Sequence, residues 1–180
     1  MGASKVQINN TNLHKIILDI SRSMLYNIIT PREKGTKKMN IYIASPLFDN
    51  WTKMIVKETE KVLKAKMPDA EIFCPQDLEI PHAWEMDNFT WARAVHEADH
   101  KAIDEADLVV CISYGYQSDD GAAWEVGYAQ ARGKKCWLFV ADMEEPYSLM
   151  FINVDKVFRY DGAVGNFELE EISKKSIEWK

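Results

Sequence analysis

From Met39 onward, short apolar runs alternate with longer segments whose apolar residues recur with the 3.6-residue period of a helix. Each apolar run has the length of a strand, and each periodic segment is long enough for a helix. This alternation predicts five β-α units around a parallel sheet. The predicted strands span residues 39–44, 70–74, 107–113, 135–141 and about 155–160.

The predicted strands differ in how continuously apolar they are. Residues 108–112 are apolar without a break, as expected of a central strand that is covered on both faces. Residues 156–160 alternate in polarity, so we expect this strand at an edge of the sheet. We therefore predict an α/β fold, a doubly wound five-stranded parallel sheet of flavodoxin-like order, with its ligand crevice beyond the carboxyl ends of the strands.

Residues 1–38 have a different pattern from the rest of the chain. Apolar residues recur at helical spacing over 11–29, with Asn10 or Thr11 placed to cap the start, and Pro31 and Gly35 then interrupt the pattern. We predict an N-terminal extension, an amphipathic helix and a linker over 30–38, followed by one domain over 39–180. The helix is expected to pack against the domain or a partner. A membrane-surface or targeting helix and a start-site artefact are the alternatives.

The formal net charge of -6 is unevenly distributed. Residues 1–38 contain seven Lys or Arg and two acidic residues, a balance of +5, so residues 39–180 carry -11. An acidic domain repels polyanions, and this disfavours a nucleic-acid polymer as a partner. A small uncharged ligand would meet no such repulsion.

The three cysteines, Cys74, Cys111 and Cys136, lie inside apolar runs, which is typical of buried thiols in a reducing compartment. No stretch has the roughly 18 apolar residues of a membrane span, and the N-terminus lacks a signal-peptide core. The four histidines are scattered, and the sequence contains no metal-ligand cluster, P-loop or GxGxxG. We therefore expect a cytoplasmic protein with no metal and no membrane partner.

Polar residues follow three of the predicted strands, at the edge where the carboxyl ends of a parallel sheet converge. In the loop after the third strand, Asp119 or Asp120 is placed to cap a helix whose early turns contain Glu125. The positive end of the helix dipole would favour the ionised form of Glu125, as a carboxylate nucleophile requires. The alternative is that both aspartates are only caps and that Glu125 is a solvated surface residue.

Three segments of the chain resemble one known family in sequence, order and spacing. They are IYIASPLF at 41–48, WARAVHEADHKAIDEADLVV at 91–110 and SDDGAAWEVGYAQARGKK at 118–135. Over about residues 39–155 the chain resembles the nucleoside 2-deoxyribosyltransferases. The most specific element is the pattern Asp-x-Gly-x-x-x-Glu-x-Gly, formed by Asp119, Gly121, Glu125 and Gly127.

The resemblance implies catalytic roles for three residues. Glu125 matches the nucleophilic glutamate, Tyr42 the tyrosine that hydrogen-bonds and positions it, and Asp99 the carboxyl that assists the leaving base. Tyr42 could otherwise be a packed strand residue, and Asp99 one of several charges on a solvated helix. An apolar stripe from Trp91 to Ala102 runs beside Asp99 and is predicted to be buried. Partial burial would raise the pKa of Asp99 and favour its protonated form.

The resemblance also implies substrate-binding residues. Asp119, with Gly121 of the same motif, would hold the sugar hydroxyls, Phe48 would lie against the base, and Glu79 stands where many members read the base with Gln. Ser148 stands where the family carries an Asn that a neighbouring subunit donates to the sugar. A serine there resembles the related deoxynucleoside 5′-monophosphate N-hydrolases, in which it contacts phosphate. The first loop, ASPLFDN, lacks the basic residue of that group.

The resemblance thus implies an N-glycosyl (pentosyl) transferase of nucleotide salvage that moves 2-deoxyribose between nucleobases through a covalent intermediate on Glu125, without a cofactor. The alternatives are hydrolysis of deoxynucleosides or their 5′-monophosphates, and a non-catalytic nucleoside-binding module. The expected partners are deoxynucleosides and free nucleobases. The family and the aromatic residues Trp84, Phe89 and Trp91 also imply a homo-oligomer, a dimer or higher.

Overall fold

The computed structural model describes residues 38–47, 49–114, 119–141, 147–160 and 169–173. Contacts divide the chain between Lys37 and Lys38, and the described residues belong to the unit Lys38–Lys180. The amphipathic helix and most of the linker predicted for residues 1–38 lie outside the described residues, so both stay predictions. No described helix is long and apolar enough to cross a membrane.

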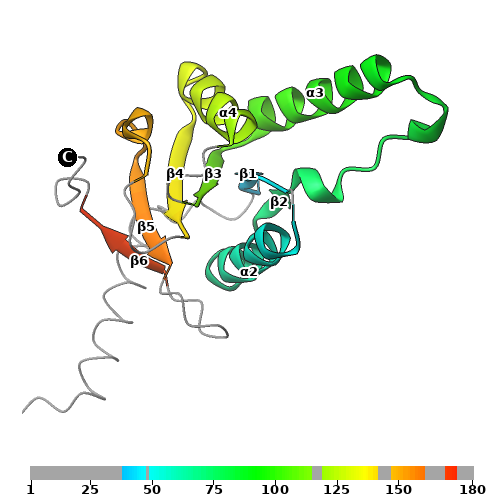
Figure 1. Ribbon diagram of the computed structural model, residues 1–180. Coiled ribbons are helices and arrows are strands. Elements are labelled where there is room, and N and C mark those ends of the chain that lie inside the picture. Colours follow the sequence, from blue (N-terminus) through cyan, green and yellow to red (C-terminus); the bar gives the residue numbers. More distant parts are fainter. Residues whose placement is uncertain (1–37, 48, 115–118, 142–146, 161–168, 174–180) are drawn as a thin grey trace, which may run out of the picture. The chain divides into compact units, whose positions relative to one another are not determined.

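A six-stranded sheet with the order β2-β1-β3-β4-β5-β6 forms the centre of this unit (Figure 1). The first five strands pair in parallel, which confirms the predicted doubly wound sheet of flavodoxin-like order. The strands are β1 (Asn40–Ala44), β2 (Glu71–Phe73), β3 (Leu108–Ser113), β4 (Lys135–Val140), β5 (Lys156–Tyr160) and β6 (Leu169–Ile172).

The sixth strand, β6, is an addition to the predicted sheet. It pairs antiparallel with β5, so the prediction that β5 lies at an edge is wrong. The sequence of β6 is Leu-Glu-Glu-Ile, and two adjacent acidic residues in so short a segment conceal the alternation that marks a strand. Alternating polarity in β5 therefore reflects how its faces are covered, and says nothing about whether its edge is paired.

Helices cover both faces of the sheet (Figure 1). Helix α2 (Asn50–Lys66) lies on one side, and α3 (Asn88–Glu105) and α4 (Asp120–Ala131) lie on the other. Each helix begins at an aspartate cap that accepts backbone N–H groups, because a carboxylate satisfies the free donors of a first helical turn. Short 3-10 turns lie in the connections: η1 (Pro75–Asp77), η2 (Ala83–Glu85) and η3 (Leu149–Phe151).

A continuous hydrophobic core lies between the sheet and the pair α3–α4. All six residues of β3 are buried, which confirms its central position. Tyr42 of β1 and Val109 of β3 pack in the same core as Val126 and Ala129 of α4. The three cysteines are buried and unpaired, as the sequence predicts. Glu125, next to Val126, is therefore carried by a helix that is fixed to the sheet.

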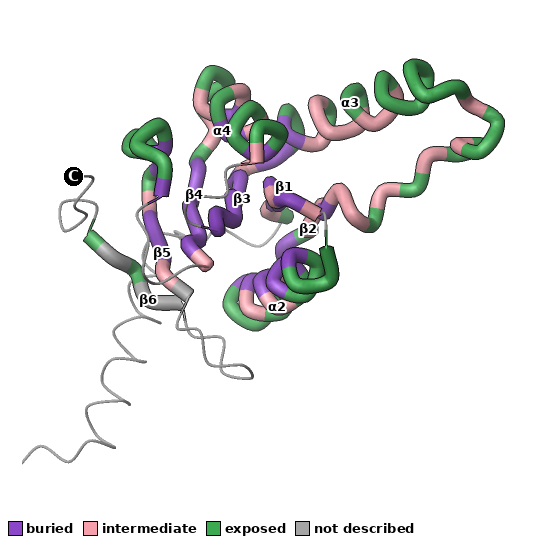
Figure 2. Tube along the Cα trace, viewed as in Figure 1, coloured by how far each residue is buried: buried purple, intermediate pink, exposed green. Residues whose placement is uncertain are grey.

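The first turns of α3 are not covered by the sheet. Residues 88–93 are exposed, and Ile103 is the buried residue of this helix (Figure 2). The predicted buried stripe is therefore wrong at its start, because Trp91 is 47% exposed, while Val95, Ala98 and Ala102 are half-buried. A helix of 18 residues is about 27 Å long and a strand of six residues about 20 Å, so α3 overhangs the sheet.

Candidate active site

The carboxyl end of β3 leads to the start of α4, which contains the Asp119–Gly127 motif. Asp119 caps the helix, and its Oδ1 accepts the backbone N–H groups of Gly121 at 2.7 Å and Ala122 at 3.4 Å. A Cβ atom at position 121 would lie 3.1 Å from this Oδ1, so a glycine permits the close turn. Glu125 follows one turn later, on the side of α4 that faces β1.

Tyr42 of β1 positions the carboxylate of Glu125 through a hydrogen bond. Its hydroxyl donates a hydrogen bond of 2.8 Å to Oε1 of Glu125, across 83 positions of sequence. Tyr42 is fully buried, and its ring stacks on Phe73 of the neighbouring strand β2 with centroids 5.5 Å apart. The hydroxyl therefore has little freedom, and the position of one carboxylate oxygen is fixed by the core.

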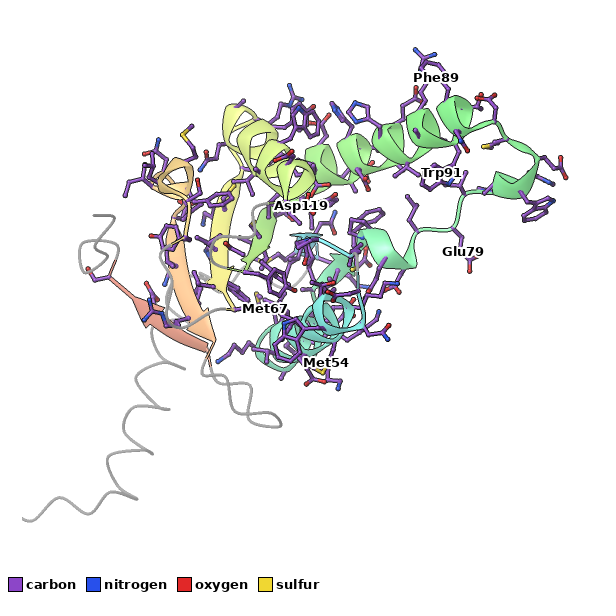
Figure 3. The ribbon with its side chains drawn as sticks, viewed as in Figure 1. Met54, Met67, Glu79, Phe89, Trp91 and Asp119 are labelled. Atoms are coloured by element: carbon purple, nitrogen blue, oxygen red, sulfur yellow. The ribbon has the colours of Figure 1, made fainter. Side chains whose placement is uncertain are left out.

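A pocket of about 470 Å³ opens between α3 and α4, and both Glu125 and Asp99 line it. We call it the α3–α4 pocket. Figure 3 shows that Trp91 and Phe89 project on different sides of α3, and of these two only Trp91 reaches the pocket. The lining residues are Trp91, Ala92, Val95, His96 and Asp99 of α3, and Gly121, Trp124 and Glu125 of α4.

Burial is the main influence on Glu125 and raises its pKa to about 8. The hydrogen bond from Tyr42 acts in the opposite direction, while the nearby Asp99 and Asp119 add to the rise. Burial therefore opposes the expected effect of the helix dipole, and Glu125 keeps its proton to a higher pH than an exposed glutamate does. The pKa of Tyr42 is also raised, first by burial and then by Glu125.

Asp99 projects from α3 into the same pocket. Burial raises its pKa to about 6, and His96 and the Tyr42 hydroxyl oppose this rise, which agrees with the effect that partial burial predicts. Oδ1 of Asp99 is buried and has no hydrogen-bond partner in the described part of the chain. A buried carboxyl oxygen without a partner is costly, and a polar group of a ligand would relieve that cost.

The structure thus brings Tyr42, Asp99 and Glu125 together, with Asp119 and Gly121 at the adjoining start of α4. It does not bring Glu79 or Ser148 to the α3–α4 pocket. Glu79 is exposed in the loop after η1 and points outward in Figure 3. Ser148 is an exposed cap of η3, where its Oγ accepts the Met150 N–H at 3.4 Å. Phe48 lies outside the described residues.

His96 is a lining residue that the sequence reasoning missed. His96 and His100 are not scattered, because their ring centroids lie 4.3 Å apart one helical turn from each other. They begin and end His-Glu-Ala-Asp-His, a match to the zinc pattern H-E-x-x-H. In the described residues their rings pack on Trp124 and on each other, and no third ligand joins them. The signal that marks His96 is its spacing of three residues from Asp99.

Among the described residues, one group of three potential metal ligands occurs, formed by Glu60, Cys74 and Asp77. The Lys57 ammonium group already lies 3.1 Å from Glu60 and 2.7 Å from Asp77, so this group is an ion-pair cluster at the surface. Neither arrangement gives the α3–α4 pocket a metal-binding set.

The model of the nucleoside 2-deoxyribosyltransferase family matches residues 41–170, and the chain belongs to this family. Among solved structures, it is similar to a 2-deoxyribosyltransferase from Bacillus psychrosaccharolyticus, with 29% identity, a TM-score of 0.61, and cover of 72% of this chain and 92% of that one. A comparison with curated proteins finds no significant match. Family members act on nucleosides and nucleobases, and the chain is an enzyme of nucleoside N-glycosidic bonds.

Two further solved structures match parts of the chain. A conserved protein from Enterococcus faecalis V583 shares 22% identity at a TM-score of 0.52, covering 59% of this chain and 65% of that one. A CMP N-glycosidase from Clostridium botulinum shares 21% identity at a TM-score of 0.45, covering 68% of this chain and 89% of that one. Neither similarity carries an inference about the activity of this chain.

Proposed function

We propose that the chain transfers 2-deoxyribose from one nucleobase to another through a covalent bond between Glu125 and C1′ of the sugar. In the first step, a Glu125 oxygen bonds to C1′, the bond from C1′ to the base nitrogen breaks, and the proton of Asp99 passes to the base. In the second step, a nitrogen of another base bonds to C1′, Glu125 leaves as a carboxylate, and the N–H proton of that base returns to Asp99.

The observation that carries this proposal is the pair of carboxyl groups in one pocket, one of them held by Tyr42. The Tyr42 hydroxyl engages Oε1 of Glu125, so we assign the attack on C1′ to Oε2. Asp99 supplies the second carboxyl from α3, and its buried Oδ1 has no hydrogen-bond partner among the described residues. A nucleophile and an acid on two facing elements are the two parts that displacement at a sugar requires.

The two pKa values set the expected pH dependence of this reaction. The reacting form needs Glu125 ionised and Asp99 protonated, whereas values of about 8 and about 6 place the single proton mainly on Glu125 near neutral pH. The form with the proton on Glu125 and the form with the proton on Asp99 carry the same number of protons. Both are therefore most populated between the two pKa values. We expect a bell-shaped profile of kcat/KM with its maximum near pH 7 and limbs near pH 6 and pH 8.

The pocket favours an uncharged nucleoside over a nucleotide. Trp91 and Trp124 give it two aromatic walls, 47% and 44% exposed, against which a flat base can stack. None of its lining residues is Lys or Arg, and a dianionic phosphate would face Asp99 and Glu125 without a cationic partner. The substrate we propose is therefore a 2′-deoxynucleoside, with a free nucleobase as acceptor.

Hydrolysis is the second candidate, and Ser148 is the observation that favours it. If this segment covers the sugar of a neighbouring subunit, a serine in place of asparagine leaves more room for water at C1′. This arrangement needs a homo-oligomer, which the exposed Trp84 and Phe89, at 81% and 74%, also support. With either activity, we propose a role in nucleotide salvage and a cytoplasmic location.

Incubation with deoxyinosine and adenine, followed by chromatography of the products, tests the proposal. Deoxyadenosine is expected; free 2-deoxyribose without deoxyadenosine identifies a hydrolase, and no product favours a binding module. A slow fluorinated deoxyribosyl donor should add its mass to the peptide that contains Glu125. The variant Glu125→Ala should remain folded, form no adduct and lose nearly all turnover. An adduct on another side chain contradicts the assignment.

A further inference from the structure

The α3–α4 pocket contains one polar side chain, besides the indole N–H groups, that the proposed reaction leaves unused. Asp99 and Glu125 are occupied with the leaving base and the sugar, and the remaining lining residues are apolar or glycine. His96 is the exception. It lies three residues before Asp99 on α3, a spacing that places two side chains on the same face of a helix.

The His96 ring is held in position by aromatic neighbours. Its centroid lies 4.3 Å from that of His100 and 5.2 Å from that of Trp124, and His100 in turn packs on Tyr128 at 4.4 Å. Trp124 and Tyr128 stack with their planes 3° apart. The imidazole thus packs on a cluster formed by both helices, and His96 itself is exposed.

The ring nitrogens of His96 are available to a ligand. His96 makes no hydrogen bond to another described residue, and its interactions are the ring contacts and its proximity to Asp99. An imidazole carries at least one N–H donor in each of its protonation states, whereas an ionised carboxyl only accepts. In a pocket with two carboxyl groups, His96 is therefore suited to an acceptor on the ligand, such as a carbonyl oxygen.

We propose that His96 is a specificity-determining residue that donates a hydrogen bond to an exocyclic carbonyl oxygen of the nucleobase. This inference rests on the proposed function and names its substrate class, the 6-oxopurines and oxopyrimidines. We place the base between Trp91 and Trp124, with one of its ring nitrogens at Asp99. Because Asp99 and His96 share one face of α3, a substituent next to that nitrogen then lies towards His96. Glu79, the base-reading residue that the resemblance implies, does not line this pocket.

Calorimetric binding of two bases to wild type and variants tests the proposal without need of turnover. Hypoxanthine carries the exocyclic oxygen, and the unsubstituted purine ring lacks it. Wild type is expected to bind hypoxanthine about tenfold more tightly, the effect of one net hydrogen bond. His96→Phe keeps a ring on the cluster and removes the donor, so it should bring the two affinities within about twofold of each other. Uracil and 2-pyrimidinone form a pyrimidine pair that tests the carbonyl oxygen at C4, which only uracil carries.

His100→Phe is the matched control, since His100 belongs to the same helix and the same aromatic cluster but does not line the pocket. It should keep the wild-type preference, and His96→Gln, which retains an N–H donor, should restore part of it. A His96→Phe protein that lowers both affinities equally, or a wild type that binds neither base or prefers neither, would overturn the proposal. Base binding without nucleoside cleavage would overturn the proposed function and leave this inference standing.

Discussion

Burial of Glu125 should make the stability of the protein fall as the pH rises, and Glu125→Gln should remove this dependence. The pKa of Glu125 in the folded protein, about 8, lies above the ordinary value of 4.5. The folded state therefore holds a proton that the unfolded chain releases, so the stabilisation is full below pH 4.5 and is lost as the pH rises to about 8. Glutamine has no proton to lose and can still accept the Tyr42 hydroxyl.

The expected size follows from the same values. At about 1.36 kcal/mol per pH unit, the loss between pH 6 and pH 8 is roughly 3 kcal/mol. For a chain of this length, that corresponds to a change of about 6–10 °C in Tm. Thermal melts of wild type and Glu125→Gln from pH 6 to pH 9 measure it, a range that avoids the sequence pI of about 5.3.

The comparison needs a glutamate that does not titrate in a buried site. Glu97 is 71% exposed on α3 and pairs with Arg93 at 3.5 Å, so Glu97→Gln should follow the wild-type curve. The Tm of Glu125→Gln should exceed that of wild type by a margin that widens with pH. A margin that stays constant from pH 6 to pH 9 would show that Glu125 titrates as a surface carboxyl, and the electrostatic description of the site would be refuted.

Two further substitutions test the roles proposed for Tyr42 and Ser148. Tyr42→Phe keeps the stack on Phe73 but removes the hydrogen bond of 2.8 Å, so kcat/KM should fall by about 10- to 100-fold. This hydrogen bond lowers the pKa of Glu125, so its loss should move the limb near pH 8 to higher pH, as stopped assays across the pH range would reveal. Unchanged limbs would mean that Tyr42 only packs. Ser148→Asn can still cap η3, and it should raise the ratio of deoxyadenosine to free deoxyribose in the incubation with deoxyinosine and adenine. An unchanged ratio would contradict the role proposed for this position.

The five parallel strands could be predicted from the sequence because buried strands are apolar runs whose length is set by the sheet. Such a pattern does not show which strand a short polar segment pairs with, so it does not predict β6. The stripe on α3 was misjudged at Trp91 because periodicity identifies the apolar face of a helix but not how far the sheet extends beneath it.

The site was less accessible to sequence reasoning than the fold. The roles proposed for Tyr42, Asp99 and Glu125 come from the resemblance, since their residue types alone are equally consistent with packing and solvated charge. The pKa of Glu125 depends on how far the packing of α4 against β1 buries it, and this is a property of the assembled core. The sequence does not indicate His96, because its place in the pocket depends on how α3 packs against α4. The sequence of one helix does not show this packing.

In the proposed function, the overhang of α3 separates bond cleavage at Glu125 from the choice of base, two tasks that many enzymes combine in the same residues. Tyr42 belongs to the sheet, where a change of volume would disturb the whole interior, whereas Ala92 and Val95 sit on a helix stretch with little beneath it. Natural variation and directed evolution can therefore remodel the choice of base along this projecting stretch at small cost to folding. The reactive centre would be inherited unchanged.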